Sequence, residues 1–267
     1  MIGLKRGTVL LVPHEKEWET AAAEAILRLK EILGDAVLDA AHVGSTSIPS
    51  IMAKPIVDIA LAVPSFESVL AREKALAENG FFYRPKASAG LPNQLLLASG
   101  SYYEGTGDLQ THFVHVVPAG SREWRDYVHF RDYLIAHPET AREYEALKLA
   151  LWETAPVDPG REKYTAGKHA FISRTLVSAE AWSFLGKTVD LLIDRPLGSV
   201  HPDHPDLIYP VNYGSLPGAP GGDGEDLDAY LVGVDAPVSA FLAEIVGFVR
   251  RRNDAEDKLI AAPPGTR

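Results

Sequence analysis

Acidic side chains crowd into the short stretch GDGEDLDAYL at residues 222–231, namely Asp223, Glu225, Asp226 and Asp228. Carboxylates this close together repel one another unless water screens them or a cation neutralises them. The neighbouring glycines favour a loop that curls before it enters a strand, and such a loop can gather Asp223, Glu225 and Asp228 round one point. Carboxylate oxygens are the ligands that Mg²⁺ prefers. The stretch therefore predicts a magnesium site, with a solvated loop or a weak Ca²⁺ site as the alternatives.

The segments on either side of this loop carry the other side chains that phosphate chemistry uses. They are Arg195 in IDRPLGS (193–199), Tyr209 and Tyr213 in IYPVNYG (208–214), and Asp254, Glu256, Asp257 and Lys258 in RRNDAEDKLIAAP (251–263). Carboxylate-bound metals activate water and neutralise a departing phosphate, while Arg, Lys and Tyr stabilise the charge that develops on oxygen. Together these residue types predict cleavage of a phosphoanhydride.

Several of these residues also have a purely structural interpretation. Arg195 has acidic neighbours at Asp190 and Asp194 with which it can form an ion pair. Tyr209 fits the apolar core, and Asp226 fits a solvated position.

A second polar loop lies in the first half of the chain, in HVGSTSIPSIMAKPIVDIALAV at residues 42–63. Gly44 lets the backbone approach a ligand closely, and the hydroxyls of Ser45, Thr46 and Ser47 can donate hydrogen bonds to phosphate oxygens beside the loop N–H groups. Asp58 follows on a buried strand, from which it can reach a metal that is bound to the same phosphate. This loop predicts a phosphate-binding site.

Regular elements must hold these loops in place. Apolar residues recur at helical spacing over residues 15–33, and strands are expected at 36–43 and 54–63. A helix at 66–79 precedes strands at 81–84, 94–98 and 110–117, and three helices follow at 122–136, 139–153 and 161–179. After Trp182 the chain changes to short strand-like runs such as TVDLLI, DAYLVGV and KLIAA, punctuated by Pro and Gly. Such runs are typical of a small β-barrel or sandwich.

Composition narrows the range of functions. A chain of 267 residues favours two domains, and the absence of cysteine excludes disulfides and thiolate chemistry. A formal net charge of −10 argues against a nucleic-acid partner, because such proteins present basic surfaces to phosphate. No stretch is long and apolar enough for a signal peptide or a membrane span, so we expect a soluble cytoplasmic protein without a membrane partner. The oligomeric state stays open, with a homo-oligomer among the options.

The first domain resembles the GrpB family, a branch of the nucleotidyltransferase superfamily, over roughly residues 7–178. The motifs that carry the resemblance are VPHEKEW, HVGSTSIP, KPIVDI, THFVHVV (111–117), FRDYLIAHPETAREYEALK (130–148) and EKYTAGKHAFI (162–172). The resemblance implies an α+β nucleotidyltransferase-like fold with a mixed sheet and helices. It also implies a nucleotide or phosphate site around Gly44, Ser45, Thr46, Lys54 and His115, with Asp58 as a metal ligand.

The chain departs from the nucleotidyltransferase pattern at one position. Nucleotidyl transfer normally uses two carboxylates two residues apart on one strand face to hold two metals, and Ala60 stands at the second place. His112 or His115 can substitute, but a regular strand places these two on opposite sides, so only one can line the site. A buried, hydrogen-bonded histidine is the alternative for His115. For Lys168 we favour a solvated helix face.

The second domain resembles the soluble inorganic pyrophosphatases across residues 184–264, which implies a small OB-like β-barrel. Acids at the first, third and sixth positions of that family's loop fall on Asp223, Glu225 and Asp228. By resemblance, Asp223 and Asp228 would bind Mg²⁺ and Glu225 would help to activate the attacking water. Arg195, Tyr213 and Lys258 would hold phosphate, and Glu256 and Asp254 would complete the metal ligands.

The sequence thus predicts a GrpB-like domain over residues 1–182 and a reduced pyrophosphatase-like barrel over residues 183–267. The favoured function is Mg²⁺-dependent hydrolysis of pyrophosphate, or of a related small phosphoanhydride, by the barrel. The first domain would bind a nucleotide or a phosphorylated metabolite. One alternative is nucleotidyl transfer by the first domain beside a degenerate barrel. The other is a module that binds nucleotide or phosphate without turnover.

Overall fold

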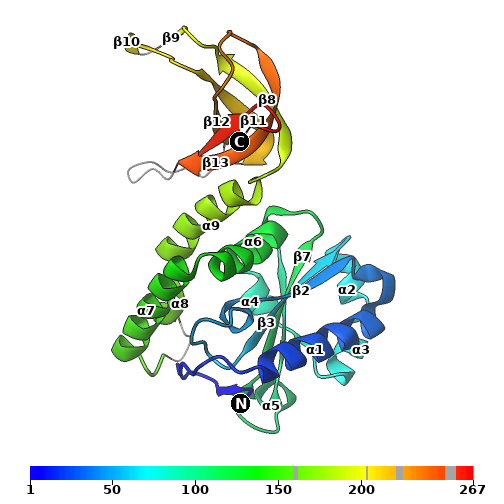
Figure 1. Ribbon diagram of the computed structural model, residues 1–267. Helices are drawn as coiled ribbons and strands as arrows, with labels where there is room; N and C mark the ends of the chain where they lie inside the picture. The colour runs from blue at the N-terminus through cyan, green and yellow to red at the C-terminus, as the bar shows by residue number, and fades with distance from the viewer. Residues whose placement is uncertain (159–161, 203, 221–224, 250–256, 267) are drawn as a thin grey trace. The chain divides into compact units, whose positions relative to one another are not determined.

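A computed structural model of the chain describes residues 1–158, 162–202, 204–220, 225–249 and 257–266. The chain divides into two compact units, Met1–Phe171 and Ile172–Arg267 (Figure 1). The division falls inside one helix, α9 (His169–Ser183), whereas the sequence places the domain boundary at that helix's end. Each unit is described by itself below.

The first unit is built on a mixed sheet of five strands in the order β2-β3-β7-β5-β4. These strands are β2 (Asp39–Val43), β3 (Val57–Val63), β7 (His112–Pro118), β5 (Leu95–Ser99) and β4 (Phe82–Tyr83). The pair β3–β7 is parallel and the other neighbours are antiparallel. A short pair, β1 (Leu4–Lys5) with β6 (Leu109–Gln110), lies apart from this sheet.

Helices lie on both faces of the sheet, with α1 on one face and α6 on the other. The helices described are α1 (Glu17–Leu33), α2 (Phe66–Leu70), α3 (Glu73–Glu78), α4 (Pro85–Ser88), α5 (Ser101–Glu104), α6 (Arg122–Ala136), α7 (Pro138–Thr154), α8 (Glu162–Ala166) and α9, which crosses the division between the units, with 3₁₀ turns at Gly34–Ala36 and Ser45–Ser47. The single helices expected at 66–79 and at 161–179 are each split in two, into α2 with α3 and α8 with α9.

The apolar core of this unit lies between α1 and one face of the sheet. Trp18 and Leu29 of α1 are fully buried against Ile59 and Leu61 of β3 and Val114 of β7. Successive strand residues point to opposite faces, so the residues between these positions face the other side, which α6 covers. The expected α+β fold is confirmed for this unit.

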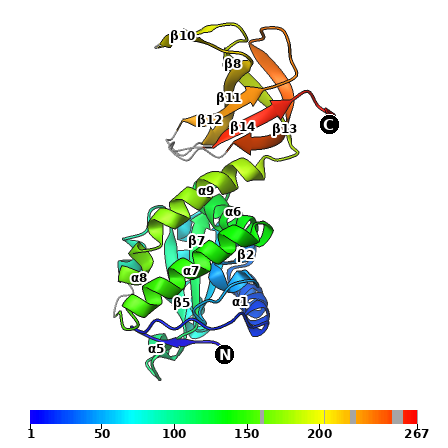
Figure 2. The same ribbon diagram turned by 60° about the vertical axis from the view of Figure 1, so that its left-hand side comes forward.

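The second unit is a closed barrel of five strands in the order β11-β12-β14-β13-β8 (Figure 2). Its strands are β8 (Thr188–Arg195), β11 (Asn212–Pro220), β12 (Asp226–Leu231), β13 (Ala240–Val249) and β14 (Lys258–Ala262), with a hairpin of β9 (Val200–His201) and β10 (His204–Ile208). Leu227, Ala229 and Leu231 of β12 face the barrel core with Leu259 of β14. A β-barrel was expected here, and its relation to the pyrophosphatase type stays a prediction.

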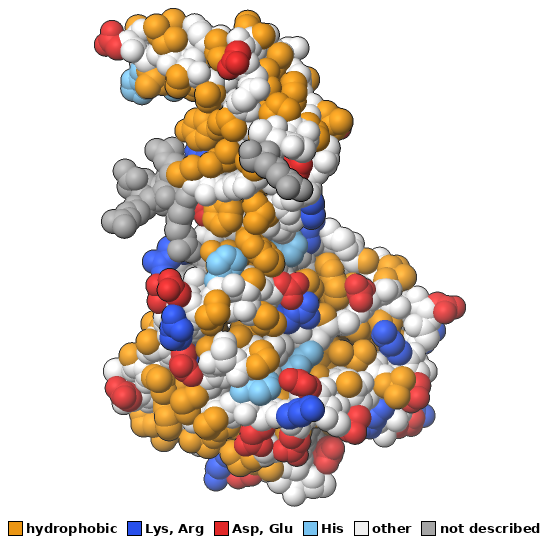
Figure 3. Space-filling view, viewed as in Figure 1, with side chains coloured by type: hydrophobic (Ala, Val, Ile, Leu, Met, Phe, Trp, Pro, Cys, Tyr) orange, Lys and Arg blue, Asp and Glu red, His pale blue; other side chains and the backbone are white. Residues whose placement is uncertain are grey.

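The charges on the surface and the lengths of the helices are relevant to nucleic-acid and membrane partners. Acidic and basic side chains are interspersed over the face of the first unit that Figure 3 shows. Among the helices described, none combines the length and the apolar character that a bilayer span needs.

Candidate functional sites

The loop after β2 is shaped by close contact with Asp58. Gly44 has φ +69°, and a Cβ added there would lie 2.7 Å from Asp58 Oδ2. The loop turns through Ser45–Ser47, where the Ser47 hydroxyl donates to the Gly44 carbonyl at 2.6 Å. The N–H groups at the start of such a turn have no partner within the turn itself. Glycine at position 44 is therefore required both by the backbone conformation and by the neighbouring carboxylate.

His42 and Arg131 stabilise this loop through hydrogen bonds. The imidazole Nε2 of His42 hydrogen-bonds Thr46 Oγ1 at 2.9 Å, and Arg131 of α6 donates to the His42 carbonyl at 2.9 Å. Burial is the main cause that lowers the pKa of His42 to about 4. His42 is therefore neutral at physiological pH. Thr46, its hydrogen-bond partner, is fully buried.

Asp58 and Ala60 share the sheet face that α6 covers, so the structure places Ala60 where a second carboxylate would stand. In the parallel ladder Ala60 is the direct partner of His115 on β7. His112 lies on the opposite face, because its ladder partner is Val57, whose side chain packs in the core beside α1. The expectation that the two histidines face opposite sides is confirmed, and His115 is the one beside Asp58.

A chain of polar contacts starts at Asp58 and runs to Gln94. His115 Nε2 lies 3.4 Å from Asp58 Oδ1, and His115 Nδ1 lies 2.9 Å from the hydroxyl of Tyr127 on α6. Tyr127 in turn donates to Gln94 Oε1 at 2.9 Å. Burial, followed by the charge of Asp58, raises the pKa of Tyr127 well above its usual range. Tyr127 therefore keeps its proton and orients the imidazole of His115.

Lysines gather on the side of the same site. The ammonium groups of Lys54 and Lys168 each lie 4.8 Å from the ring centroid of Tyr164. Burial lowers the pKa of Lys168, and the charge of Asp58 raises it in part. The interpretation of Lys168 as part of a solvated helix face is wrong, because its ammonium is packed on a buried tyrosine ring.

Lys148 is a third lysine of this cluster and is almost fully buried. Its ammonium donates to the Met52 carbonyl and lies 4.9 Å from the ring centroid of Tyr144. Glu145, one turn earlier on α7, accepts a hydrogen bond from the Met52 N–H at 2.5 Å. Burial first, and then the charge of Lys168, lowers the pKa of Lys148 to about 7. The two side chains thus bind both backbone polar groups of Met52, in the segment that leads from the loop to Lys54.

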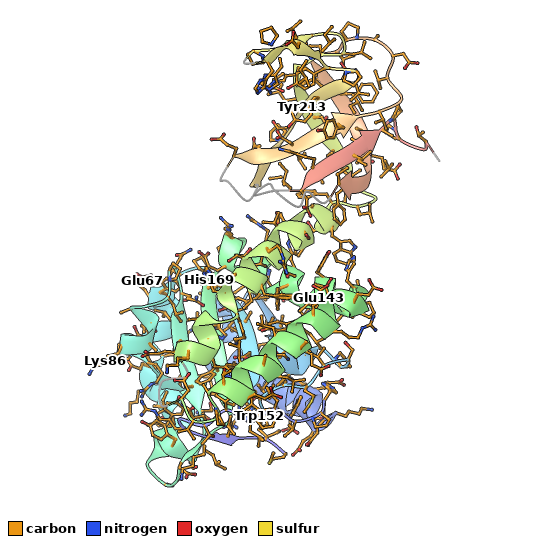
Figure 4. The ribbon with its side chains drawn as sticks, turned by 90° about the vertical axis from the view of Figure 1, so that its left-hand side faces the viewer. Glu67, Lys86, Glu143, Trp152, His169 and Tyr213 are labelled. Carbon is orange, nitrogen blue, oxygen red and sulfur yellow. The ribbon has the colours of Figure 1, made fainter. Side chains whose placement is uncertain are left out.

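The barrel brings together part of its predicted site on its outer face, opposite the core residues of β12. Asp228 accepts hydrogen bonds from both the Tyr213 hydroxyl and the Lys258 ammonium. Tyr213 (labelled in Figure 4) lies opposite Arg195 in the β11–β8 ladder, with the guanidinium carbon 5.9 Å from its ring centroid. Burial and the bond to Asp228 raise the pKa of Tyr213 above its usual range.

The structural interpretations of this region also find support. Arg195 forms an ion pair with Asp194 at 2.7 Å, and Tyr209 is buried. Asp226 is exposed and accepts a hydrogen bond from the Gly218 N–H at 2.9 Å. Glu225 is exposed immediately before β12.

Of the expected metal ligands of the barrel, Asp228 lies within the described residues. Asp223, Asp254 and Glu256 lie outside the described residues. Among the residues that the structure does describe, no group of three or more His, Asp or Glu side chains is placed to hold a metal. The described residues therefore do not by themselves form a magnesium centre, and Asp228 is held by a lysine and a tyrosine.

Sequence reasoning missed several residues that the structure places at these sites. Tyr127 and Gln94 orient His115, yet they lie on other elements and form no local motif with it. Asn212 of YPVNYG is fully buried, and it accepts from the N–H groups of Leu197 and Val238 at 2.9 and 3.2 Å while donating to two carbonyls. It ties the connections of the barrel together and takes no part in the outer-face cluster.

Comparison with known proteins identifies the first unit. A model of the GrpB protein family matches residues 8–177, which is more than half of the chain. The chain belongs to the GrpB protein family. The expected resemblance over residues 7–178 is confirmed, and we refer below to Met1–Phe171 as the GrpB unit.

Relatives of known sequence share this unit. The glutamate-rich protein GrpB of Alkalihalophilus pseudofirmus is 33% identical over 66% of this chain and 98% of its own length. The UPF0157 protein YqkA of Bacillus subtilis is 34% identical over 67% of this chain, and the match spans about half (49%) of YqkA. A crystal structure of the conserved protein GrpB from Enterococcus faecalis is similar with a TM-score of 0.56 and 29% identity, over 64% of this chain and 96% of that protein.

The barrel has weaker counterparts. An inorganic pyrophosphatase from Neisseria gonorrhoeae is matched at 24% identity over 31% of this chain and 58% of that protein. Its TM-score of 0.26 is too low to support any argument about fold or function. The pyrophosphatase resemblance therefore rests on the sequence motifs alone.

Proposed function

We propose that the GrpB unit binds the phosphate groups of a nucleotide or of a phosphorylated metabolite beside the loop Gly44–Ser47. The observation that carries the proposal is the convergence of Lys54 and Lys168 on the ring of Tyr164, close enough to Asp58 for its charge to act on Lys168. The hydroxyl of Ser45 acts on the pKa of Tyr144, against which Lys148 packs, so loop and lysines share one neighbourhood.

The electrostatics favour an anion at this place. Burial lowers the pKa of both Lys148 and Lys168, and the charge of Lys168 lowers the pKa of Lys148 further, while Glu145 acts on Lys148 and Asp58 acts on Lys168 in the opposite direction. A bound phosphate would supply the missing negative charge and accept charge-assisted hydrogen bonds from the lysines. Asp58 then stands beside the phosphate as the carboxylate for an accompanying cation.

Calorimetric titration of the full chain with ATP and with pyrophosphate tests this proposal. Lys168→Met should weaken binding by about 10–100-fold, because a hydrogen bond to a charged group contributes about 1.5–3 kcal/mol. Lys163→Met, an exposed position on α8, is the matched control and should bind like the wild type. Equal affinities for the two variants, or no binding by the wild type, would contradict the proposal.

We propose a second function for the barrel, hydrolysis of pyrophosphate or a related small phosphoanhydride, with Mg²⁺ as the expected cofactor. It is favoured by one observation: Tyr213, Lys258 and Arg195 gather round Asp228 on one outer face. These donors can hold phosphate oxygens, whereas the remaining acids expected to bind Mg²⁺ lie outside the described residues.

Release of phosphate from pyrophosphate, measured with and without Mg²⁺, tests this second proposal. Asp228→Asn should abolish the release, and Asp226→Asn on the same strand should retain it. A wild-type chain that releases no phosphate with Mg²⁺ would contradict the proposal. If nucleotide still binds to such a chain, the alternative of a binding module without turnover is favoured. Because the two proposals concern different units, either can fail without the other.

A further inference from the structure

The hydrogen bonds of Tyr127 determine which nitrogen of His115 carries a proton. A phenol has one hydrogen to donate, and Tyr127 donates it to Gln94 Oε1 at 2.9 Å. At the 2.9 Å contact between Tyr127 and His115 Nδ1, the imidazole must then be the donor. The neutral ring consequently has its hydrogen on Nδ1 and a lone pair on Nε2.

This tautomer leaves two acceptors facing each other. His115 Nε2 is 3.4 Å from Asp58 Oδ1, which is longer than a typical charge-assisted hydrogen bond of about 2.7–2.9 Å. A lone pair opposite a carboxylate oxygen is unfavourable unless a cation joins them. Both side chains retain access to solvent, with 17% of His115 and 31% of Asp58 exposed. Ala60, the ladder partner of His115, has only a methyl group for a side chain and so places no polar group beside this pair.

We propose that Asp58 and His115 together bind a divalent transition-metal ion such as Mn²⁺ or Zn²⁺, with Tyr127 and Gln94 holding the imidazole in the metal-binding tautomer. Histidine ligands of metals generally donate their other ring N–H to an oxygen, as His115 does to Tyr127. An imidazole nitrogen favours these ions over Mg²⁺, which prefers oxygen ligands alone. The protein supplies two ligands, so water and the phosphate oxygens of the proposed ligand would complete the coordination.

Binding of Mn²⁺ alone, followed by the loss of the free-ion signal in electron paramagnetic resonance, tests the proposal without any phosphate ligand. The full chain is used with Asp228→Asn in every sample to weaken the predicted site of the barrel, and each further variant is compared with this single variant. Asp58→Asn or His115→Ala should abolish binding. Zn²⁺ should displace the bound Mn²⁺ at lower concentration than Mg²⁺ does.

Two further variants separate a metal ligand from a merely structural histidine. Tyr127→Phe removes the acceptor of the Nδ1 hydrogen and should weaken Mn²⁺ binding by about 10–100-fold. Gln94→Glu keeps an acceptor for the Tyr127 hydroxyl and should retain affinity within a few-fold. The proposal is overturned if the Asp228→Asn chain binds no Mn²⁺, or if adding His115→Ala leaves its Mn²⁺ affinity unchanged. In that case Asp58 and His115 are joined by a proton and not by a metal ion. Since no phosphate is present, these results do not depend on whether the proposed phosphate site exists.

Discussion

Ala60 on β3 and His115 on β7 are direct partners in the parallel ladder of the GrpB unit. The position at which nucleotidyl transfer normally uses a second carboxylate is thus filled by a methyl group, with an imidazole alongside it. Asp58 precedes Ala60 on the same face and lies against both His115 and Gly44. The site that we propose for the GrpB unit therefore has one carboxylate, one histidine and the lysines near them.

The contact between Gly44 and Asp58 predicts an unusually costly glycine substitution. Gly44→Ala places a methyl group 2.7 Å from Asp58 Oδ2 in a backbone of positive φ, so we expect it to destabilise the GrpB unit by more than about 2 kcal/mol. Gly105→Ala is the control, because it also has positive φ but meets nothing within 4 Å, and should cost about 1 kcal/mol. Urea unfolding followed by tryptophan fluorescence measures both. Similar costs at the two positions would contradict the contact.

The burial of Lys148 predicts a pH dependence of stability. Its pKa is about 7 in the folded chain and 10.5 in its ordinary state, so the unfolded chain binds more protons between these values. Stability should therefore rise with pH in this range, by up to about 1.4 kcal/mol per pH unit from this group. Lys148→Met should remove that slope and Lys74→Met, at an exposed lysine, should keep it. The measurement is urea unfolding at several pH values between about 7.5 and 9.5. If the unfolding free energy of the wild type and of Lys148→Met rises equally with pH, Lys148 does not cause the pH dependence.

Asp228 should be more important for the stability of the barrel than the neighbouring acid on its strand. Asp228→Asn leaves the buried ammonium of Lys258 without this carboxylate and should cost about 1–3 kcal/mol. Asp226→Asn keeps an oxygen for the Gly218 N–H at an exposed position and should change stability by less than about 0.5 kcal/mol. Thermal unfolding compares the two, and an unchanged midpoint for Asp228→Asn would argue against the Lys258 contact.

Asn212 should behave as a structural residue although it lies within a motif that resembles a phosphate site. Asn212→Ala removes four hydrogen bonds from a fully buried position and should destabilise the barrel by about 2–4 kcal/mol. Asn212→Asp keeps the oxygen that accepts from Leu197 and Val238 but loses both donors, so we expect it to be destabilising as well. Urea unfolding of both variants is the measurement. A stable Asn212→Ala chain that has lost phosphate binding would instead assign Asn212 to a site.

The sequence predicted what is local and missed what tertiary packing creates. The apolar run of β3 and the glycine of the polar loop revealed the strand, the turn and Asp58, because periodicity and a glycine are visible in a single segment. Helix spacing suggested that Lys168 faces solvent, since nothing in the spacing shows that Tyr164 packs beneath it. Tyr127 of α6 and Gln94, the residue before β5, meet His115 only when these elements fold against β7, so no local pattern could find them.

The location of a bound phosphate tests the central claim most directly. A crystal of the full chain with a thiophosphate analogue of ATP would place the ligand through the anomalous signal of its sulfur. The account predicts a peak beside the ammonium groups of Lys54 and Lys168, next to Asp58 and the Gly44–Ser47 loop. A peak found only at the Asp228 cluster of the barrel, with none at these lysines, would contradict it.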